Sequence, residues 1–407
     1  MRTVANEEDV ERVAAFNAII HNESVGETVR RICYHHPSIR PGDFIFVENE
    51  KTGQVVSSLS CNPWRWRYDG EELLAGEMGF VGTLEPYRGR GLVRAQVGLF
   101  KEMLRERGYH LSHIQGIPYY YRQFGYEYAL PLETDVRLGL YQVPSLPEDG
   151  EPTHTCRLAV QTGFPALARL YAEATQDIDI YAERDEAIWR YLWKQTPGTE
   201  MEAEVWLVED RAGQPAGYFR VQKHPFGEGL TPNEVSRLSH DAALTVLRQL
   251  AALAQERGKP YIRLNLPAGC TLVQEALALG AHDRGSYAWQ IHIPDPAHLL
   301  RAIGPALERR VAASAYAGLT TDLRTHLFRK TLLMRWRDGR LADVTWTDQS
   351  AGWTLRLPPP LLAPVILGHW SWQELARTRP DVAVAGEWVP LLDVLFPSMR
   401  AYIYQIY

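Results

Sequence analysis

The stretch that most constrains this chain is FVGTLEPYRGRGLVR, residues 80–94. An apolar, strand-like run leads into Arg88-Gly89-Arg90-Gly91. A helical pattern follows directly, and its apolar face carries Val93, Val97, Phe100 and Leu104. A glycine-rich turn between a strand and a helix leaves unpaired backbone N–H groups at the helix N-terminus, where an anion is favoured. The sequence therefore predicts a strand–turn–helix corner that can bind an anion.

The residue types in this corner suit a diphosphate. Glycines at 89 and 91 let a diphosphate approach the backbone, and Arg88, Arg90 and Arg94 add charged donors. A nucleotide P-loop is excluded because no Lys-Ser/Thr follows the glycines. The GxGxxG-plus-acid pattern of a dinucleotide fold is also missing. A corner with solvated arginines and no ligand stays open, because spacing alone does not separate the two.

Composition limits the class of protein. The 407 residues predict roughly two to four domains, and 45% hydrophobic with 23% charged residues is too apolar for disorder. The cysteines at 33, 61, 156 and 270 are widely spaced and form no CxxC pair, which argues against disulfides and a thiolate zinc site and favours a reducing cytosol. His35-His36 lacks partners at metal spacing, so no metal is predicted.

Charge and hydropathy also indicate partners and location. The net charge of −6 argues against a broad nucleic-acid or anionic-membrane surface and is compatible with cationic partners. No run approaches the ~20 apolar residues that span a bilayer. The charged N-terminus has no apolar region typical of a secretory signal. We therefore expect a cytoplasmic protein.

The chain divides into three parts. Residues 1–150 predict helices at 9–20 and 27–34, strands at 44–48, 54–60 and 72–83, the helix after Gly91, a strand at 110–114 and a tyrosine-rich turn. Residues 143–154, rich in Pro, Gly and acidic residues, predict a linker. From about residue 296 the pattern is mixed, with a hairpin at Asp338-Gly339, helices at 363–367 and 372–378, and an aromatic C-terminal tail.

The middle part repeats the plan of the first. Strands at 204–209 and 216–221 precede a helix with Ala243, Leu247, Leu250 and Ala254 on one face. Glu106-Arg107-Gly108 recurs as Glu256-Arg257-Gly258 at the same point, and Phe124-Gly125 has a counterpart in Leu279-Gly280. This order predicts an internal duplication. Residues 237–241 stand in the place of the glycine-rich corner but contain no glycine, so the second unit is predicted to be structural.

The motif V-x-T-x-x-x-Y-R-G-R-G-L, here residues 81–92, resembles the acyl-CoA pyrophosphate loop of the GNAT N-acetyltransferases. The loop's sixth residue is commonly Gly or Ala, but here it is Val93. Val93 with Arg94, and the block Tyr121-Arg122-Gln123-Phe124-Gly125-Tyr126, are similar to the enhanced-intracellular-survival (Eis) branch. Leu84-Glu85-Pro86 departs from that branch, whose proline more often comes one residue earlier.

The resemblance implies an α+β fold with tandem GNAT units. We expect a catalytic GNAT domain at 1–150, a degenerate second GNAT-like domain at 151–295 and a sterol-carrier-protein-like domain at 296–407. It also implies a homo-oligomer that transfers acetyl directly from acetyl-CoA to an amine. By the same resemblance, Val81, Gly82 and Thr83 pair with the pantetheine arm, and Gly116 and Ile117 line the thioester gap. The pyrophosphate would be held by residues of the loop: Arg88, Gly89, Arg90, Gly91, Leu92, Val93 and Arg94.

Tyr121 is the predicted general acid. A Tyr pKa near ~10 keeps the proton available at neutral pH for a thiolate whose acid has a pKa of roughly 8.5 or above. Its register relative to Phe124-Gly125 singles it out. The alternative is that Tyr121 only packs within an aromatic run.

The resemblance points to the main-chain carboxylate of Tyr407 as general base. A carboxylate with a pKa of about 3.5 is weak, but burial raises its pKa. The apolar, aromatic tail is typical of a terminus that enters a core; a packing tail with a solvated carboxylate is the alternative. Glu77, on the strand before the loop, is a rival base or a pocket or surface carboxylate.

Three functions remain open. The leading one is acetylation of a primary amine, with aminoglycosides or polyamines as acceptors by resemblance. Acetylation of a protein lysine uses the same chemistry. A CoA-sensing or lipid-binding scaffold would bind ligand without turnover.

Overall fold

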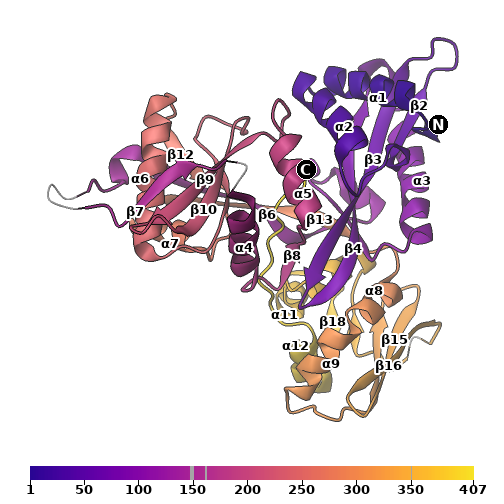
Figure 1. Cartoon of the computed structure of the whole chain (residues 1–407). Coiled ribbons are helices and arrows are strands. Elements are labelled where there is room, and N and C mark those ends of the chain that lie inside the picture. The colour runs from indigo at the N-terminus through magenta and orange to yellow at the C-terminus, as the bar shows by residue number, and fades with distance from the viewer. Residues whose placement is uncertain (147–150, 161–162, 350) are drawn as a thin grey trace.

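The computed structural model describes residues 1–146, 151–160, 163–349 and 351–407. In Figure 1 the first unit is indigo to purple, the second lies beside it, and the third packs below the first. The predicted linker at 143–154 and the boundary at 150/151 include residues 147–150, which lie outside the described residues.

The first unit contains β1 (Arg2–Thr3), α1 (Glu7–Ile20), α2 (Glu23–His35), β2 (Phe44–Glu48), β3 (Val55–Tyr68), β4 (Glu71–Thr83), α3 (Leu92–Glu106), β5 (Leu111–Ile114), the 3-10 turn η3 (Tyr120–Phe124) and β6 (Glu127–Gly139). The second contains β7 (His154–Leu158), α4 (Phe164–Thr175), β8 (Ile180–Ala182), α5 (Glu186–Lys194), β9 (Ala203–Asp210), β10 (Pro215–Gln222), β11 (Pro232–Val235), α6 (His240–Glu256), β12 (Tyr261–Leu264), α7 (Thr271–Ala278) and β13 (His282–His292). The third contains α8 (Pro296–Ala302), α9 (Gly304–Ala312), β14 (Thr321–His326), β15 (Thr331–Arg337), β16 (Arg340–Thr347), β17 (Leu355–Arg356), α10 (Leu362–Ile366), α11 (Trp372–Thr378), β18 (Ala383–Val384) and α12 (Val389–Leu395).

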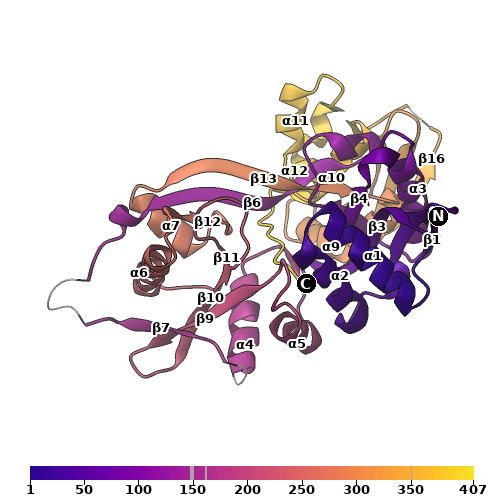
Figure 2. The same ribbon diagram turned by 90° about the horizontal axis from the view of Figure 1, so that it is seen from above.

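Strand β13 of the second unit is built into the sheet of the first. The sheet runs β1-β2-β3-β4-β5-β13-β6-β12, and β8 pairs with β3. β13 pairs antiparallel with β5 on one side and with β6 on the other. β6 in turn continues into the second unit, where it pairs with β12. Figure 2 shows β6 and β13 as two long ribbons that run side by side through both units. The two units therefore share one hydrogen-bonded sheet.

Two layers of side chains cover this sheet. On one face, Cys61 and Met78 pack with Phe100 and Leu104 of α3. On the other, Trp64 and Trp66 belong to the core that includes α1, α2 and much of the third unit. Side chains alternate between faces along a strand, so neighbouring residues of β3 and β4 serve different cores.

The repeated ERG segment forms the same turn in both units. In each unit the ERG segment ends the long helix: Tyr109 N–H donates to Leu104 C=O at 2.9 Å after α3, and Lys259 N–H donates to Ala254 C=O at 2.8 Å after α6. The glycine at each turn has a positive φ, 70° at Gly108 and 61° at Gly258. This repeated helix ending fits the tandem GNAT fold.

The third unit confirms the predicted hairpin. β15 and β16 pair antiparallel, and both turn residues have positive φ, 49° at Asp338 and 76° at Gly339. The sheet order is β16-β15-β14-β17-β18, with helices packed against it. The mixed α+β class predicted for the chain is confirmed, while the likeness of this unit to sterol carrier protein stays a prediction.

One strand is longer than the sequence indicated. The Asn62-Pro63 pair predicted a break after residue 60, but β3 continues to Tyr68 and Pro63 is paired with Gly76 of β4. On the other side of β3, pairing with β2 ends at Ser60 and pairing with β8 begins at Trp66. Pro63 falls in this interval, where a missing N–H removes no ladder bond to those strands.

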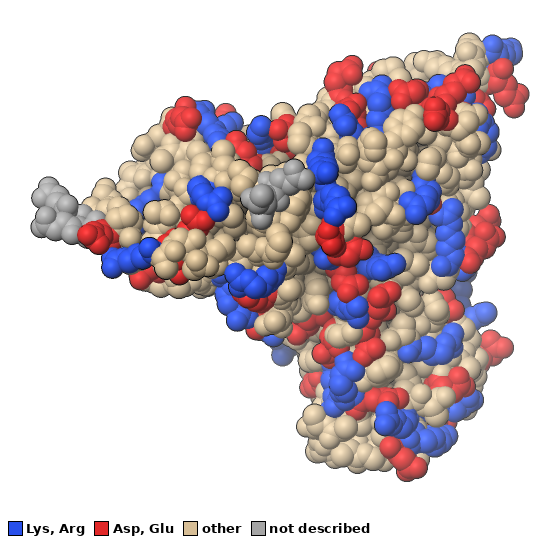
Figure 3. Space-filling view, viewed as in Figure 1, with Lys and Arg blue, Asp and Glu red and all other residues tan. Residues whose placement is uncertain are grey.

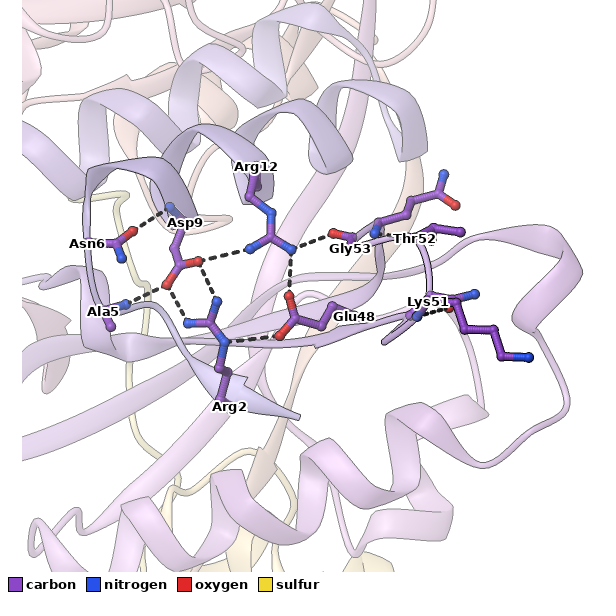
Figure 4. A network of polar contacts seen from close by, with 11 residues as sticks. Arg2, Ala5, Asn6, Asp9, Arg12, Glu48, Lys51, Thr52 and Gly53 are labelled. Atoms are coloured by element: carbon purple, nitrogen blue, oxygen red, sulfur yellow. Dashed lines mark hydrogen bonds and ion pairs between the residues drawn. The ribbon is translucent and has the colours of Figure 1, made fainter.

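A surface ion network fixes the start of the first unit. Figure 4 shows Arg2 and Arg12 bridging Asp9 of α1 and Glu48 of β2. Asn6 caps α1 by accepting from the Asp9 N–H at 2.9 Å. At the other end of α1, a Cβ on Gly82 would lie 2.8 Å from Ile20, so α1 rests directly on β4. The network therefore ties the start of α1 to β2, while the end of α1 rests on the strand that leads to the glycine-rich corner.

The described residues give two further findings. Positive and negative side chains are interspersed over the face in Figure 3, and neither sign dominates it. Within the described ranges no helix has the length and apolar character needed to cross a bilayer.

The shared sheet predicts how fragments behave. A fragment of residues 1–150 lacks β13, so β5 and β6 lose their common partner, and we expect no cooperative thermal transition. A fragment of residues 1–295 keeps β13 and should protect the β5 amides from hydrogen exchange, as the full chain does. A 1–150 fragment that melts cooperatively as a monomer would contradict this account.

Candidate active site

Strands β4 and β5 diverge next to the glycine-rich corner. Their parallel pairing covers only residues 75–77 of β4 and 111–113 of β5, although β4 runs on to Thr83. The register of β4 on β3 shifts between Ser58 and Ser60, and Phe80 has a φ of 50° at this irregularity. Within the described residues, the segment Val81-Gly82-Thr83 thus has no strand partner on its β5 side. An edge of this kind can pair with an extended amide-bearing chain.

The corner itself has the geometry predicted for an anion site. Gly91 is the N-cap of α3 with φ 75°, and no side chain caps the helix. A Cβ at Gly89 or Gly91 would meet nothing within 4 Å, so the space in front of both residues is open. Arg88, Arg90 and Arg94 are exposed around it. Leu92 and Val93 form the first turn of α3. The helix end therefore offers uncapped N–H groups and three cations to an anion.

Tyr121 lies against the end of β5. A Cβ on Gly116 would come within 2.3 Å of the Tyr121 ring, so only glycine allows this close approach. The ring is 6% exposed and packs with Phe124 and Tyr126. Burial raises the pKa of the Tyr121 hydroxyl above its ordinary value, which keeps its proton at neutral pH.

Residues of β13 hold the segment that follows β5. Gln290 Nε2 donates to the carbonyls of Gly116 at 3.2 Å and Ile117 at 3.3 Å. The Tyr287 hydroxyl also donates to the Gly116 carbonyl. The Ile117 side chain remains 65% exposed. The second unit therefore fixes the backbone on which Tyr121 rests.

The C-terminal tail enters the first unit from the other face of the sheet. Tyr407 is buried, and its hydroxyl donates to the carboxylate of Glu77. Trp64 Nε1 donates to the same carboxylate at 3.1 Å, and Asn62 Nδ2 donates to the Tyr407 hydroxyl at 3.2 Å. The Tyr407 ring lies 6.1 Å from the ring of Phe80, at the irregularity of β4. The apolar tail thus enters a core, as its sequence predicted.

Burial makes Glu77 an unusual carboxyl. It raises the pKa of Glu77 to about 7, although hydrogen bonds from Tyr407, Asn62 and Trp64 act in the opposite direction. Glu200, whose pKa burial also raises to about 7, adds its repulsion to Glu77. A carboxyl with a pKa near neutrality can accept a proton at physiological pH.

His36 anchors the tail, and both of its ring nitrogens take part in hydrogen bonds to the backbone. Its Nδ1 accepts the N–H groups of Ser38 at 3.2 Å and Ile39 at 3.1 Å, so Nε2 carries the proton and donates to the Ile406 carbonyl at 3.3 Å. Burial lowers the pKa of His36 to about 4 and keeps the ring neutral. No group of three or more potential metal ligands occurs among the described residues.

The predicted residues form two groups on opposite faces of the sheet. Tyr121 packs in the cluster that includes α3, and Arg94 Nη2 joins that helix to Gln123 beside Tyr121 at 2.8 Å. Tyr407 packs in the cluster that includes α1 and α2, next to Glu77. The parting of β4 and β5 lies between the two groups. Tyr121 and the Tyr407–Glu77 pair therefore lie on opposite faces of the sheet in which β4 and β5 diverge.

Sequence reasoning missed the residues that support this gap. Asn62 was read as part of a turn, and Gln290 belongs to a unit predicted to be only structural. Trp64 was unremarkable among many aromatic residues. A polar residue within a strand that otherwise reads as apolar, as Gln290 is in AWQIHI, is the one local signal that pointed to it.

Comparison with known proteins identifies the first unit. Residues 2–129 match the family model of the acetyltransferase (GNAT) domain. Among curated proteins no sequence matches the chain.

Solved structures match over the full length at low identity. A probable N-acyltransferase of unknown function from Enterococcus faecalis is 13% identical with a TM-score of 0.75, covering 100% of this chain and 99% of its own. A GCN5-related N-acetyltransferase from Anabaena variabilis is 17% identical with a TM-score of 0.69, covering 98% of both chains. Eis1 from Mycobacterium abscessus is 15% identical with a TM-score of 0.65, covering 99% of this chain and 98% of its own.

These likenesses show a common fold, and the domain match adds the chemistry. An uncapped helix end beside an open strand edge suits the diphosphate and the amide-bearing arm of an acyl-CoA. The match of residues 2–129 to the GNAT acetyltransferase domain, together with the shared fold, supports an acyltransferase, and a GNAT domain implies an acyl-CoA as its partner.

Proposed function

We propose that the protein transfers the acetyl group of acetyl-CoA directly to a primary amine of a small cationic acceptor, aminoglycoside-like or polyamine-like. The observation that carries this proposal is the parting of β4 and β5 between the uncapped helix α3 and Tyr121. It is a gap in which a thioester can lie with a proton donor on one face and carboxyls on the other. The branch would be the Eis type, working as a cytoplasmic homo-oligomer with the three domains predicted above.

Acetyl-CoA would use the residues of the first unit in turn. The N–H groups of residues 89–94 and the arginines hold the pyrophosphate, and the backbone of Val81, Gly82 and Thr83 pairs with the pantetheine arm. Gly116 and Ile117 line the thioester gap, where Gln290 fixes their backbone. This arrangement holds the reacting carbonyl in place and lowers the entropy cost of the reaction.

The transfer then requires two proton movements. The neutral amine nitrogen attacks the thioester carbon, the C–S bond breaks, and the thiolate takes the proton of the Tyr121 hydroxyl. The proton lost by the amine passes to a carboxyl at the tail, either the terminal carboxylate of Tyr407 or Glu77. Glu77 accepts the Tyr407 hydroxyl directly, and the terminal carboxylate belongs to that same residue.

The carboxyls also support a cationic acceptor. Glu77 and Glu200 lie close enough that Glu200 influences the titration of both Glu77 and Tyr407. The Tyr407 hydroxyl binds Glu77, so the residue that carries the terminal carboxylate is docked against this acidic side chain. Acidic groups of this kind attract an acceptor that carries several amines, while a protein lysine would bring a single cation.

A ligand-binding scaffold is the second candidate, and one cavity favours it. A space of about 720 Å³ lies between the third unit and the strands β6 and β13, lined by apolar residues, by Arg122, Arg377 and Arg379, and by Glu127 and Glu374. Its apolar wall suits the apolar body of a ligand, and its polar rim carries both signs of charge, with Arg122 paired to Glu127 at 2.6 Å. A scaffold of this kind would bind such a ligand, or CoA, without turning over acetyl-CoA.

Turnover with a panel of amines, followed by mass spectrometry of the products, tests the proposed function. We expect acetylated polyamines or aminoglycosides, and a Tyr121→Phe variant with kcat reduced about 10²-fold or more, since general acid catalysis contributes roughly 10²–10⁴-fold. Tyr120→Phe is the matched control, because Tyr120 is a neighbouring tyrosine of the same turn. Full activity in Tyr121→Phe would disprove the acid role, and CoA binding without turnover would favour the scaffold.

The pH dependence of kcat/KM separates the two base candidates. A base acts only when deprotonated, so with Glu77 as base the rate should rise with pH through about 7 and level off above it. Glu77→Gln would then remove most of the activity and this titration together. With the Tyr407 carboxylate as base, Glu77→Gln keeps substantial activity, whereas removing Tyr407 abolishes it. Full activity in both variants would exclude a base at the tail.

A further inference from the structure

The C-terminal tail, residues 400–407, is held almost entirely by the second unit before it reaches the first. The N–H of Asp179 donates to the Arg400 carbonyl at 2.7 Å, and Tyr402 N–H donates to the Ile180 carbonyl at 3.0 Å. Apart from the bridge between Ala401 and Ile180, the tail forms no regular secondary structure. Tertiary contacts alone therefore fix its path, which reaches the junction of the units in Figure 1.

Among the described residues, Arg184 makes the hydrogen bond from the second unit that lies nearest the end of the tail. Its side chain, in the segment between β8 and α5, is 0% exposed, and its Nη2 donates to the carbonyl of Gln405. The guanidinium also binds Glu234 through two parallel bonds of 2.6 and 2.9 Å. It lies 4.7 Å from the ring centre of Tyr171 and 4.9 Å from that of Trp189. A planar group held in this way has a fixed position and direction.

The buried side chains around Arg184 carry more positive than negative charge, and the tail helps to compensate for this excess. Glu234 also accepts from Arg220 at 3.1 Å and from the Tyr218 hydroxyl at 2.6 Å. Burial alone would raise the pKa of Glu234, but Arg184 and Arg220 lower it to about 2, so the carboxylate is ionised. Two buried guanidiniums thus share one carboxylate. The dipole of the Gln405 carbonyl, which belongs to the tail, points at Arg184 and stabilises the excess positive charge.

This contact lies at Gln405, two positions before Tyr407. A chain extends at most about 3.3–3.6 Å per residue, so fixing the carbonyl of residue 405 confines the last residue to a small volume. Within that volume His36 binds the carbonyl of Ile406, and Glu77 accepts the Tyr407 hydroxyl. The contact at residue 405 therefore sets where the chain end can lie.

We propose that Arg184 is a positioning residue of the active site, which clamps the tail so that Tyr407 stays docked against Glu77. The second unit thereby completes the catalytic centre of the first. This role in turnover rests on the proposed acetyltransferase function. The clamp itself is a property of the fold and is tested without it.

The test compares Arg184→Lys with Arg220→Lys. Lysine keeps the charge, but its single ammonium group cannot bind both oxygens of Glu234 and the Gln405 carbonyl together. Arg220 belongs to the same buried network, and among the described residues no hydrogen bond or ion pair joins its side chain to the tail. Both variants therefore weaken the network, while only Arg184→Lys releases the tail. Thermal melting of both variants checks that each remains folded.

The first measurement is the release of tyrosine from the native protein by a carboxypeptidase. A docked Tyr407 is protected, and loss of a charged hydrogen bond should raise the release rate about tenfold or more in Arg184→Lys relative to Arg220→Lys. Equal release rates would overturn the clamp. This result holds whether or not the wild-type protein acetylates any amine.

The second measurement is steady-state kinetics with acetyl-CoA and an active amine. Arg184→Lys should lower kcat about tenfold or more below Arg220→Lys and leave the KM for acetyl-CoA unchanged, because the glycine-rich corner is untouched. Faster tyrosine release with an unchanged kcat would show that the docked tail is not needed for turnover and would overturn the positioning role. Absence of turnover in the wild type would refute the proposed function. The clamp would then be tested by the tyrosine-release measurement alone.

Discussion

The pairing of β13 with both β5 and β6 is the constraint on which the rest of the structure depends. Backbone N–H and C=O groups buried in a core must be paired, and β13 satisfies those of two strands of the first unit at once. The same strand carries Gln290, which holds the carbonyls of Gly116 and Ile117. Strand β13 therefore bridges β5 and β6 within the sheet and joins the two units. It also fixes the backbone of Gly116 and Ile117 beside the gap between β4 and β5. The second unit contributes to the site although it has no glycine-rich corner of its own.

The candidate site gathers local features that a stable strand would avoid. Phe80 has a left-handed backbone, the register of β4 on β3 shifts between Ser58 and Ser60, and Glu77 is buried with its pKa raised. Each costs stability, and such departures concentrate at functional sites, where the surrounding fold maintains them. Here they surround the end of the tail: Phe80 and Trp64 pack on the Tyr407 ring, and Glu77 accepts its hydroxyl.

Local features of this chain were predictable from sequence, and long-range ones were not. The helix after Gly91, the hairpin at Asp338-Gly339 and the repeated ERG turn each have a signal within a few neighbouring residues, and each is confirmed. The insertion of β13 and the bond between Tyr407 and Glu77, 330 residues apart, have no such signal. The apolar tail predicted burial but not its binding partners. Asn62 misled the prediction because an Asn-Pro pair more often marks a turn.

The central claim is that one gap between β4 and β5 brings an acyl-CoA between Tyr121 and the docked chain end. A crystal structure of the protein with acetyl-CoA tests this most directly. The account predicts the pyrophosphate at Gly89–Gly91, the pantetheine along Val81-Gly82-Thr83, and the sulfur within hydrogen-bond reach of the Tyr121 hydroxyl, directly or through one water. It also predicts that the carboxyls of Glu77 and Tyr407 face the thioester from the opposite side. A CoA bound elsewhere, or a sulfur remote from both groups, would contradict the account.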